Sequence, residues 1–211
     1  MTLRIRAALI SLSLCATAWA NPSQDTIDLY NQAAQGDSAL VEQVRIKLEQ
    51  RVEAEGKQPL TLVYLGGTHT LMGRDAWMPW NKLSHVETGV SFIHQGLALL
   101  KEQAVPLDEQ PRVLGLPDSQ LAQANAAVTF TQLPEFFGQF DAGYDLYLTL
   151  LSDKAFEAQP IEACAWVYLY AIHAALKADD DYQARLWLKT LEGRAPQHPI
   201  TDQARALLED G

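Results

Sequence analysis

Apolar residues recur every three or four positions along most of this chain, which is the spacing of one face of an α-helix. Runs that alternate apolar and polar residues, as half-buried β-strands do, are hard to find. The pattern therefore predicts an all-α protein in which consecutive helices pack as antiparallel pairs. The expected helices cover residues 26–35, 38–52, 60–72, 84–101, 119–131, 141–152, 160–178, 182–192 and 199–208.

Local signals place several helix ends. Gly36 and Gly56 follow the last apolar residue of a helix, and Pro59 suits the first turn of the next one. The clearest start is Ser84-His85-Val86-Glu87, which fits a capping box: the serine and glutamate side chains each bond a backbone N–H that has no partner within the helix. Residues 179–181 are three aspartates, which we expect in a solvated turn that favours the N-terminus of the following helix.

Several small and aromatic residues are expected to pack between helices. Gly89 and Gly96 lie two turns apart in one helix, where each costs about 1 kcal/mol of helix propensity relative to alanine. We therefore expect them to allow a neighbouring helix to approach closely. Gly66 lacks the lysine and the strand context of a phosphate-binding loop, so we expect it at a helix contact as well. The adjacent Phe136 and Phe137 are expected in the core.

The first twenty residues have the organisation of a secretory signal peptide. Arg4 and Arg6 precede an apolar run at residues 7–16, and Ala18 and Ala20 supply the small residues of a cleavage site. A membrane anchor is the alternative, but the run is shorter than the roughly 20 residues that a spanning helix needs. We expect cleavage after Ala20 and a periplasmic or secreted protein, with residues 21–211 forming a single helical-repeat domain that has no transmembrane segment.

Charge and cysteine content narrow the possible partners. The 211 residues include 16 basic and 26 acidic side chains, a formal charge of −10, which becomes −12 when the two arginines of the expected leader are removed. Such a surface repels phosphate backbones, so nucleic acid is not an expected partner. Cys164 is then the one remaining cysteine, and its apolar neighbours predict a small buried side chain rather than a reactive thiol.

Short helices paired at a spacing of roughly 34 residues resemble tetratricopeptide repeats. Leu62-x2-Leu65-Gly66-x2-His69 follows the first-helix pattern W-x2-L-G-x2-Y, with leucine and histidine in place of tryptophan and tyrosine. Ala184-x3-Leu188 and the later Pro196 follow the second-helix pattern. The chain is thus similar to exported bacterial proteins of tetratricopeptide-like type. That resemblance implies a short α-solenoid, with a concave binding surface and a last helix that caps the stack.

Residues 73–83 depart from the repeat, because an extended connection is expected where the repeat has a tight turn. This segment contains the candidate partner-binding residues Arg74, Asp75, Trp77, Trp80 and Lys82. In one interpretation the two tryptophans plug the helix pair, Arg74 and Asp75 form a local ion pair and Lys82 is solvated. In the other, the segment edges a binding groove, because Trp and Arg are enriched at the residues that dominate interfaces.

Two functional hypotheses remain open. The first is a non-catalytic adaptor or scaffold, without a cofactor or metal, that binds another protein or peptide in an envelope complex. The second is a small exported metal-assisted hydrolase that uses His69, Asp75 and His85. The chain has no H-E-x-x-H motif, no paired cysteines and no histidines at i, i+4, so the sequence favours the adaptor. A purely structural subunit of an oligomer is a third option.

Overall fold

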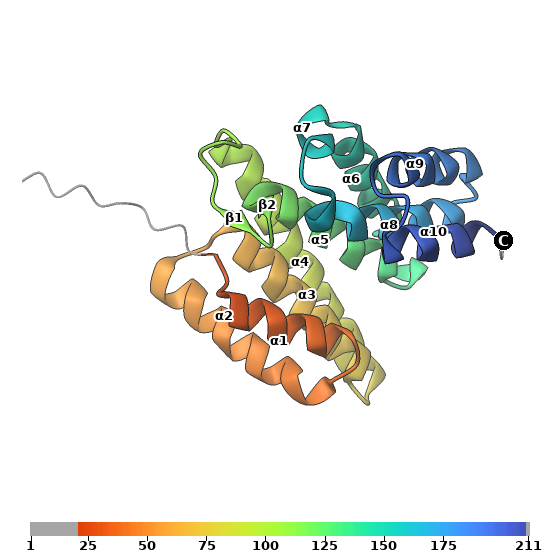
Figure 1. Cartoon of the computed structure of the whole chain (residues 1–211). Helices are drawn as coiled ribbons and strands as arrows, with labels where there is room; N and C mark the ends of the chain where they lie inside the picture. Colours follow the sequence, from red (N-terminus) through yellow and green to blue (C-terminus); the bar gives the residue numbers. More distant parts are fainter. Residues whose placement is uncertain (1–20, 210–211) are drawn as a thin grey trace, which may run out of the picture.

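The computed structural model describes residues 21–209, and within that range it is an all-α protein with one small β-hairpin (Figure 1). The expected fold class is therefore confirmed, while the expected signal peptide lies outside the described residues. The elements are α1 (Gln24–Ala34), η1 (Ser38–Leu40), α2 (Val41–Glu55), α3 (Pro59–Asp75), α4 (Pro79–Gln103), β1 (Arg112–Val113), β2 (Leu116–Pro117), α5 (Asp118–Gln132), η2 (Glu135–Phe137), α6 (Phe140–Ser152), α7 (Lys154–Glu157), α8 (Ile161–Lys177), α9 (Asp181–Arg194) and α10 (Pro199–Glu209).

Helices that are neighbours in sequence pack in pairs, of which α3 and α4 form the most intimate. A Cβ atom placed on Gly89 would lie 2.5 Å from the carbonyl oxygen of Gly66, and one on Gly96 would lie 2.8 Å from that of Pro59. Because the contact partners run in opposite directions along the two helices, the pair is antiparallel. The expectation that Gly66, Gly89 and Gly96 allow close helix packing is confirmed.

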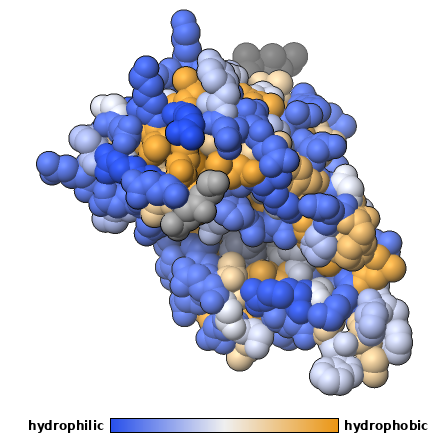
Figure 2. Space-filling model, turned by 90° about the vertical axis from the view of Figure 1, so that its right-hand side faces the viewer, coloured by the Kyte–Doolittle hydropathy of each residue, from blue (hydrophilic) through white to orange (hydrophobic). Residues whose placement is uncertain are grey.

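Five helices form a contiguous row, in the order α1, α3, α5, α8 and α10. In this row α1 contacts α3, α3 contacts α5, α5 contacts α8 and α8 contacts α10, while α2, α4, α6 and α9 each pack beside a member of it. Figure 1 shows α1–α4 on one side of α5 and α6–α10 on the other. Seen from its right-hand side, the molecule is hollowed at its middle (Figure 2). In the described part of the chain, none of the helices is long and apolar enough to cross a membrane.

Two local predictions in the C-terminal half are confirmed. The aspartate turn precedes α9, where Asp180 Oδ1 accepts a hydrogen bond from the Gln183 N–H at 3.0 Å and its Oδ2 accepts one from the Tyr144 hydroxyl at 2.8 Å. Cys164 is fully buried. Arg194, brought from α9, donates a hydrogen bond to its sulfur at 3.8 Å. Burial still raises the pKa of the Cys164 thiol, because the nearby guanidinium offsets that effect only in part.

Other local predictions are wrong. Helix α4 begins at Pro79 rather than at Ser84, so Ser84 lies inside the helix and its predicted capping box does not form. The residue before a proline avoids helical dihedrals, and Met78 is accordingly extended, at φ −86° and ψ 133°, immediately before the helix. Phe137 packs against the core as expected, but the Phe136 side chain is 76% exposed.

Candidate functional site

The turn between α3 and α4 carries four exposed apolar side chains within seven residues. Trp77 and Trp80 are 88% and 65% exposed, and Met78 and Leu83 are 39% and 44% exposed. We call these four side chains the aromatic tip. Single exposed apolar residues are common on protein surfaces, but a close group of large ones marks an interaction site. The aromatic tip is therefore the candidate functional site.

Backbone chemistry explains why the chain turns here. Ala76 ends α3 in an extended conformation, at φ −64° and ψ 138°, and Pro79 occupies the first turn of α4, where its missing N–H is not needed. Only residues 76–78 connect the helices. Gly73 lets the two helices meet beside the turn, since a Cβ atom there would lie 2.6 Å from Cγ2 of Val86. The two helices meet closely beside the connection, and the side chains of Trp77 and Met78 lie at the surface.

Arg74 fastens this end of α3 to the C-terminus of α1. Its Nη2 donates to the carbonyl oxygen of Ala33 at 3.1 Å, and its Nη1 donates to that of Ala34 at 3.2 Å. The last carbonyl groups of a helix lack partners within the helix and carry the negative end of its dipole, so a guanidinium is favourable there. Arg74 also pairs with Asp75 at 2.7 Å, and this hydrogen bond raises the pKa of Arg74.

Lys82 closes the turn from the other helix. Its ammonium group donates to the carbonyl oxygen of Arg74 at 3.2 Å, which satisfies an acceptor in the last turn of α3. The charged residues at this turn therefore bond to the protein itself. Trp77 and Trp80, which extend from the same turn, remain exposed.

The structure brings all five predicted partner-binding residues to one end of the helix pair, but not in the expected form. The prediction of an extended connection at residues 73–83 is wrong, because Arg74 and Asp75 belong to α3 while Trp80 and Lys82 belong to α4. The plug interpretation is also wrong for both tryptophans, although its Arg74–Asp75 ion pair is confirmed. Lys82 is exposed to solvent as that interpretation expected, and it also bonds to the C-terminal end of α3.

Met78 and Leu83 belong to the aromatic tip but are not among the residues that the sequence predicts as partner-binding. The signal that identifies Leu83 is the start of α4 at Pro79, because Trp80 and Leu83 then stand three residues apart on one face of a helix. With a helix start at Ser84, Trp80 and Leu83 both fall in the connection and are not expected on one helix face.

The amount of exposed indole surface sets a scale for what the tip can contribute to binding. Burying the exposed parts of Trp77 and Trp80 would contribute roughly 7 kcal/mol, at about 25 cal/mol per Å² of apolar area. Association itself costs about 4–15 kcal/mol. The tip alone therefore supports weak binding, and a stable complex needs further contacts beside it.

The three residues of the hydrolase hypothesis do not form a metal-ligand set. The rings of His69 and His85 are 6.2 Å apart between centroids, and Asp75 bonds to Arg74. No group of three His, Cys, Asp or Glu side chains within residues 21–209 is arranged to hold a metal ion. His69 lies against Phe92, with ring centroids 5.4 Å apart. Burial lowers the pKa of His69, and the neighbouring His85 lowers it further.

Comparisons with protein-family models, with curated proteins and with solved structures find no match for this chain. The tetratricopeptide resemblance therefore stays a prediction, and the candidate site is defined by geometry alone.

Proposed function

We propose that this chain is a non-catalytic adaptor that binds another protein or peptide through the aromatic tip of the α3–α4 pair. The observation that carries the proposal is the exposure of Trp77, in the three-residue turn, and of Trp80, in the first turn of α4. Tryptophan is the residue type most enriched among those that dominate binding energy in protein interfaces. A tip held by Arg74 and Lys82 also loses little conformational entropy when it binds.

The shape and charge of the tip favour a protein partner over other classes. The turn lies at the far end of α3 and α4, away from the C-terminal half (Figure 1), so it suits insertion into a pocket of a partner better than enclosure of a small molecule. A membrane surface rich in anionic lipid is attracted by basic side chains. Here Arg74 and Lys82 bond to carbonyl groups of the protein, and the chain as a whole carries a charge of −10.

Two further considerations support an envelope location and a repeat architecture. The basic, then apolar, then small-residue order of residues 1–20 is that of an export signal. The contact order of α1, α3, α5, α8 and α10 is the neighbour-to-neighbour packing expected of a short solenoid. We therefore propose a periplasmic or secreted scaffold, serving an envelope complex such as the periplasmic side of a transport system.

Crosslinking in the cell envelope tests the proposal. The double variant Trp77→Ala/Trp80→Ala should reduce capture of the partner at least tenfold while the helical circular-dichroism signal stays at the wild-type level. The matched control is Phe136→Ala/Tyr182→Ala, because these aromatic side chains are 76% and 78% exposed and belong to other elements. The control should retain full capture.

Two results would contradict the proposal. Equal loss of capture in the tip variant and the control would show that exposed aromatic surface in general, rather than the tip, mediates binding. Co-sedimentation with neutral phosphatidylcholine vesicles that depends on Trp77 and Trp80 would assign the tip to a membrane instead of a protein.

A further inference from the structure

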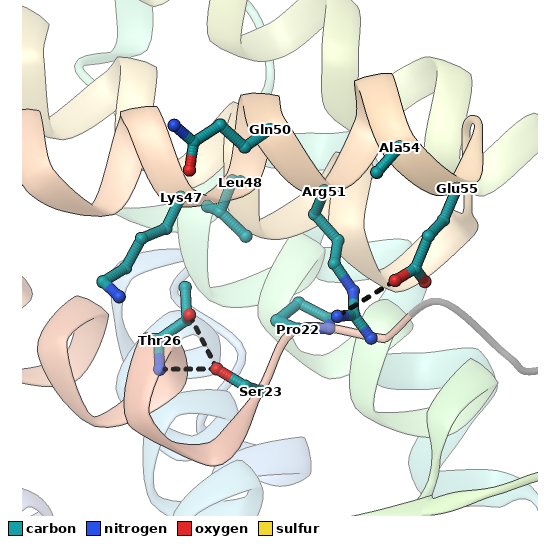
Figure 3. Close-up of a pocket in the computed structure, with 9 residues that line it drawn as sticks. All are labelled: Pro22, Ser23, Thr26, Lys47, Leu48, Gln50, Arg51, Ala54 and Glu55. Carbon is teal, nitrogen blue, oxygen red and sulfur yellow. Dashed lines mark hydrogen bonds and ion pairs between the residues drawn. The ribbon is translucent and has the colours of Figure 1, made fainter.

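A second surface feature, far from the aromatic tip in sequence, has the chemistry of an anion site. It is a pocket of about 290 Å³ between the N-terminus of α1 and the C-terminal half of α2 (Figure 3). Ser23 and Thr26 line it from the α1 side, and Lys47, Arg51 and Glu55 line it from α2.

Two cationic side chains of α2 extend into the space between the helices. Figure 3 shows Lys47 and Arg51, one helical turn apart, both pointing from α2 toward the segment that carries Ser23 and Thr26. Lys47 has no hydrogen bond or ion pair within the described part of the chain. The two side chains therefore bring positive charge to one pocket of a protein whose formal charge is −10.

Arg51 has hydrogen-bonding capacity that the protein does not use. Its Nη1 pairs with a carboxylate oxygen of Glu55 at 3.1 Å, whereas its Nε is buried and has no hydrogen-bond partner. Solvent does not reach this buried nitrogen, so a ligand in the pocket would bond elsewhere on the guanidinium. Nη2 is the available donor, because it has no hydrogen bond or ion pair within residues 21–209.

The α1 side of the pocket adds hydroxyl groups and a favourable dipole. The hydroxyls of Ser23 and Thr26 lie 2.9 Å apart and hydrogen-bond to each other, and Ser23 also accepts from the Thr26 N–H at 3.3 Å. The pocket thus lies at the N-terminal end of an eleven-residue helix, where the helix dipole is positive. Glu55 is the one acidic side chain among the pocket residues, and it is already paired with Arg51.

We propose that this pocket binds a phosphate group, carried either by inorganic phosphate or by a small phosphomonoester. Lys47 would supply a point charge, the Arg51 guanidinium would supply directed N–H donors, and the hydroxyls of Ser23 and Thr26 would complete the set of donors. The pocket is open to solvent, so the expected dissociation constant is on the order of 1 mM at low ionic strength. This site is independent of the aromatic tip.

Isothermal titration calorimetry of the purified protein tests the assignment, with inorganic phosphate in one arm and glycerol 3-phosphate in the other. Saturable binding is expected, and Lys47→Gln should weaken it at least tenfold. Arg51→Gln should weaken it similarly. The matched control is Lys57→Gln, which removes the same charge from a lysine that bonds to Gln95 outside the pocket. Tighter binding of one probe identifies whether the ligand is the free anion or an ester.

Several outcomes would overturn the assignment. The absence of a saturable isotherm with both probes would reject the site. If Lys57→Gln weakened binding as much as Lys47→Gln, the binding would be non-specific charge attraction rather than binding in the pocket. The substitution of Lys47 keeps the test independent of folding, because this exposed side chain has no bond to lose within residues 21–209. Trp77→Ala/Trp80→Ala should bind phosphate normally, so failure of the adaptor proposal leaves this one standing.

Discussion

At the scale of single residues, local sequence patterns predicted where small side chains pack between helices. They did not predict which large apolar side chains are exposed to solvent. Gly89 and Cys164 lie where the sequence placed them, because a helix contact and a buried thiol are properties of the local helix face. For Trp77 and Trp80 the sequence left burial and exposure open, and the structure leaves them 88% and 65% exposed. Which of the two holds depends on how α3 and α4 pack beside the turn, and composition does not encode that packing.

His69 gives a prediction at this scale. Burial and the adjacent His85 lower the pKa of His69 below its ordinary value of about 6.5. Arg45 of α2 acts in the same direction, while Glu49 and Glu42 of α2 act against it. The folded protein thus binds a proton here less readily than the unfolded chain does, so its stability is complete above about pH 6.5 and falls as the pH drops through the lowered pKa.

Urea denaturation between about pH 8 and about pH 5 measures this effect. The variant His69→Gln removes the titrating group and should lose less stability across that interval than the wild type. His173→Gln, on the exposed face of α8, serves as the control and should follow the wild type. A His69→Gln variant that loses as much stability as the wild type would contradict the assignment.

At the scale of elements, helical periodicity predicted every long helix, and the errors are at boundaries. The expected helices ended at residue 72 and began again at Ser84, but Gly73 is a packing position within α3 and Ser84 lies inside α4. Glycine and serine are found both at helix ends and inside packed helices, so neither residue fixes a boundary. A proline followed by helix-forming residues is more specific, since it belongs in the first turn of a helix. A helix start predicted from Pro79 instead of Ser84 places Trp80 and Lys82 on α4.

The glycine contacts of α3 and α4 lead to a second prediction. Gly89→Ala should destabilise the protein by about 2 kcal/mol, because its new Cβ would lie 2.5 Å from the backbone oxygen of Gly66 and backbone cannot rotate aside. The gain in helix propensity offsets only about 1 kcal/mol of that strain. The control is Gly193→Ala in α9, where a new Cβ would meet nothing within 4 Å, so the same propensity gain should appear without a clash.

Thermal and urea unfolding of the two variants measure the difference. The Gly89→Ala midpoint should fall below that of the wild type, and the Gly193→Ala midpoint should equal or exceed it. Equal midpoints for Gly89→Ala and the wild type would mean that α3 and α4 do not pack at this distance.

At the scale of the whole molecule, the sequence predicted that consecutive helices pack in pairs. It did not predict which helix of one pair packs against the next pair. Helix α5 contacts α3 and α4 on one side and α6 and α8 on the other, and most of its residues are buried. Its buried positions consequently surround the helix instead of forming one stripe, as a central position in the molecule requires.

Both halves of the molecule pack against α5, so we predict that it unfolds as one cooperative unit. Separating the halves would expose a buried helix to water.

Trp187 of α9 is 4% exposed and makes an edge contact with Tyr144, so its fluorescence reports the C-terminal half. In a background with the tryptophans at positions 19, 77, 80 and 166 changed to phenylalanine, Gly89→Ala should shift the Trp187 transition and the circular-dichroism transition by the same amount. The substitution lies in α4, outside the C-terminal half, so coupling through α5 is the physical reason for the shared shift. A Trp187 midpoint that stays at its original value while the dichroism curve splits into two steps would show that the halves unfold independently.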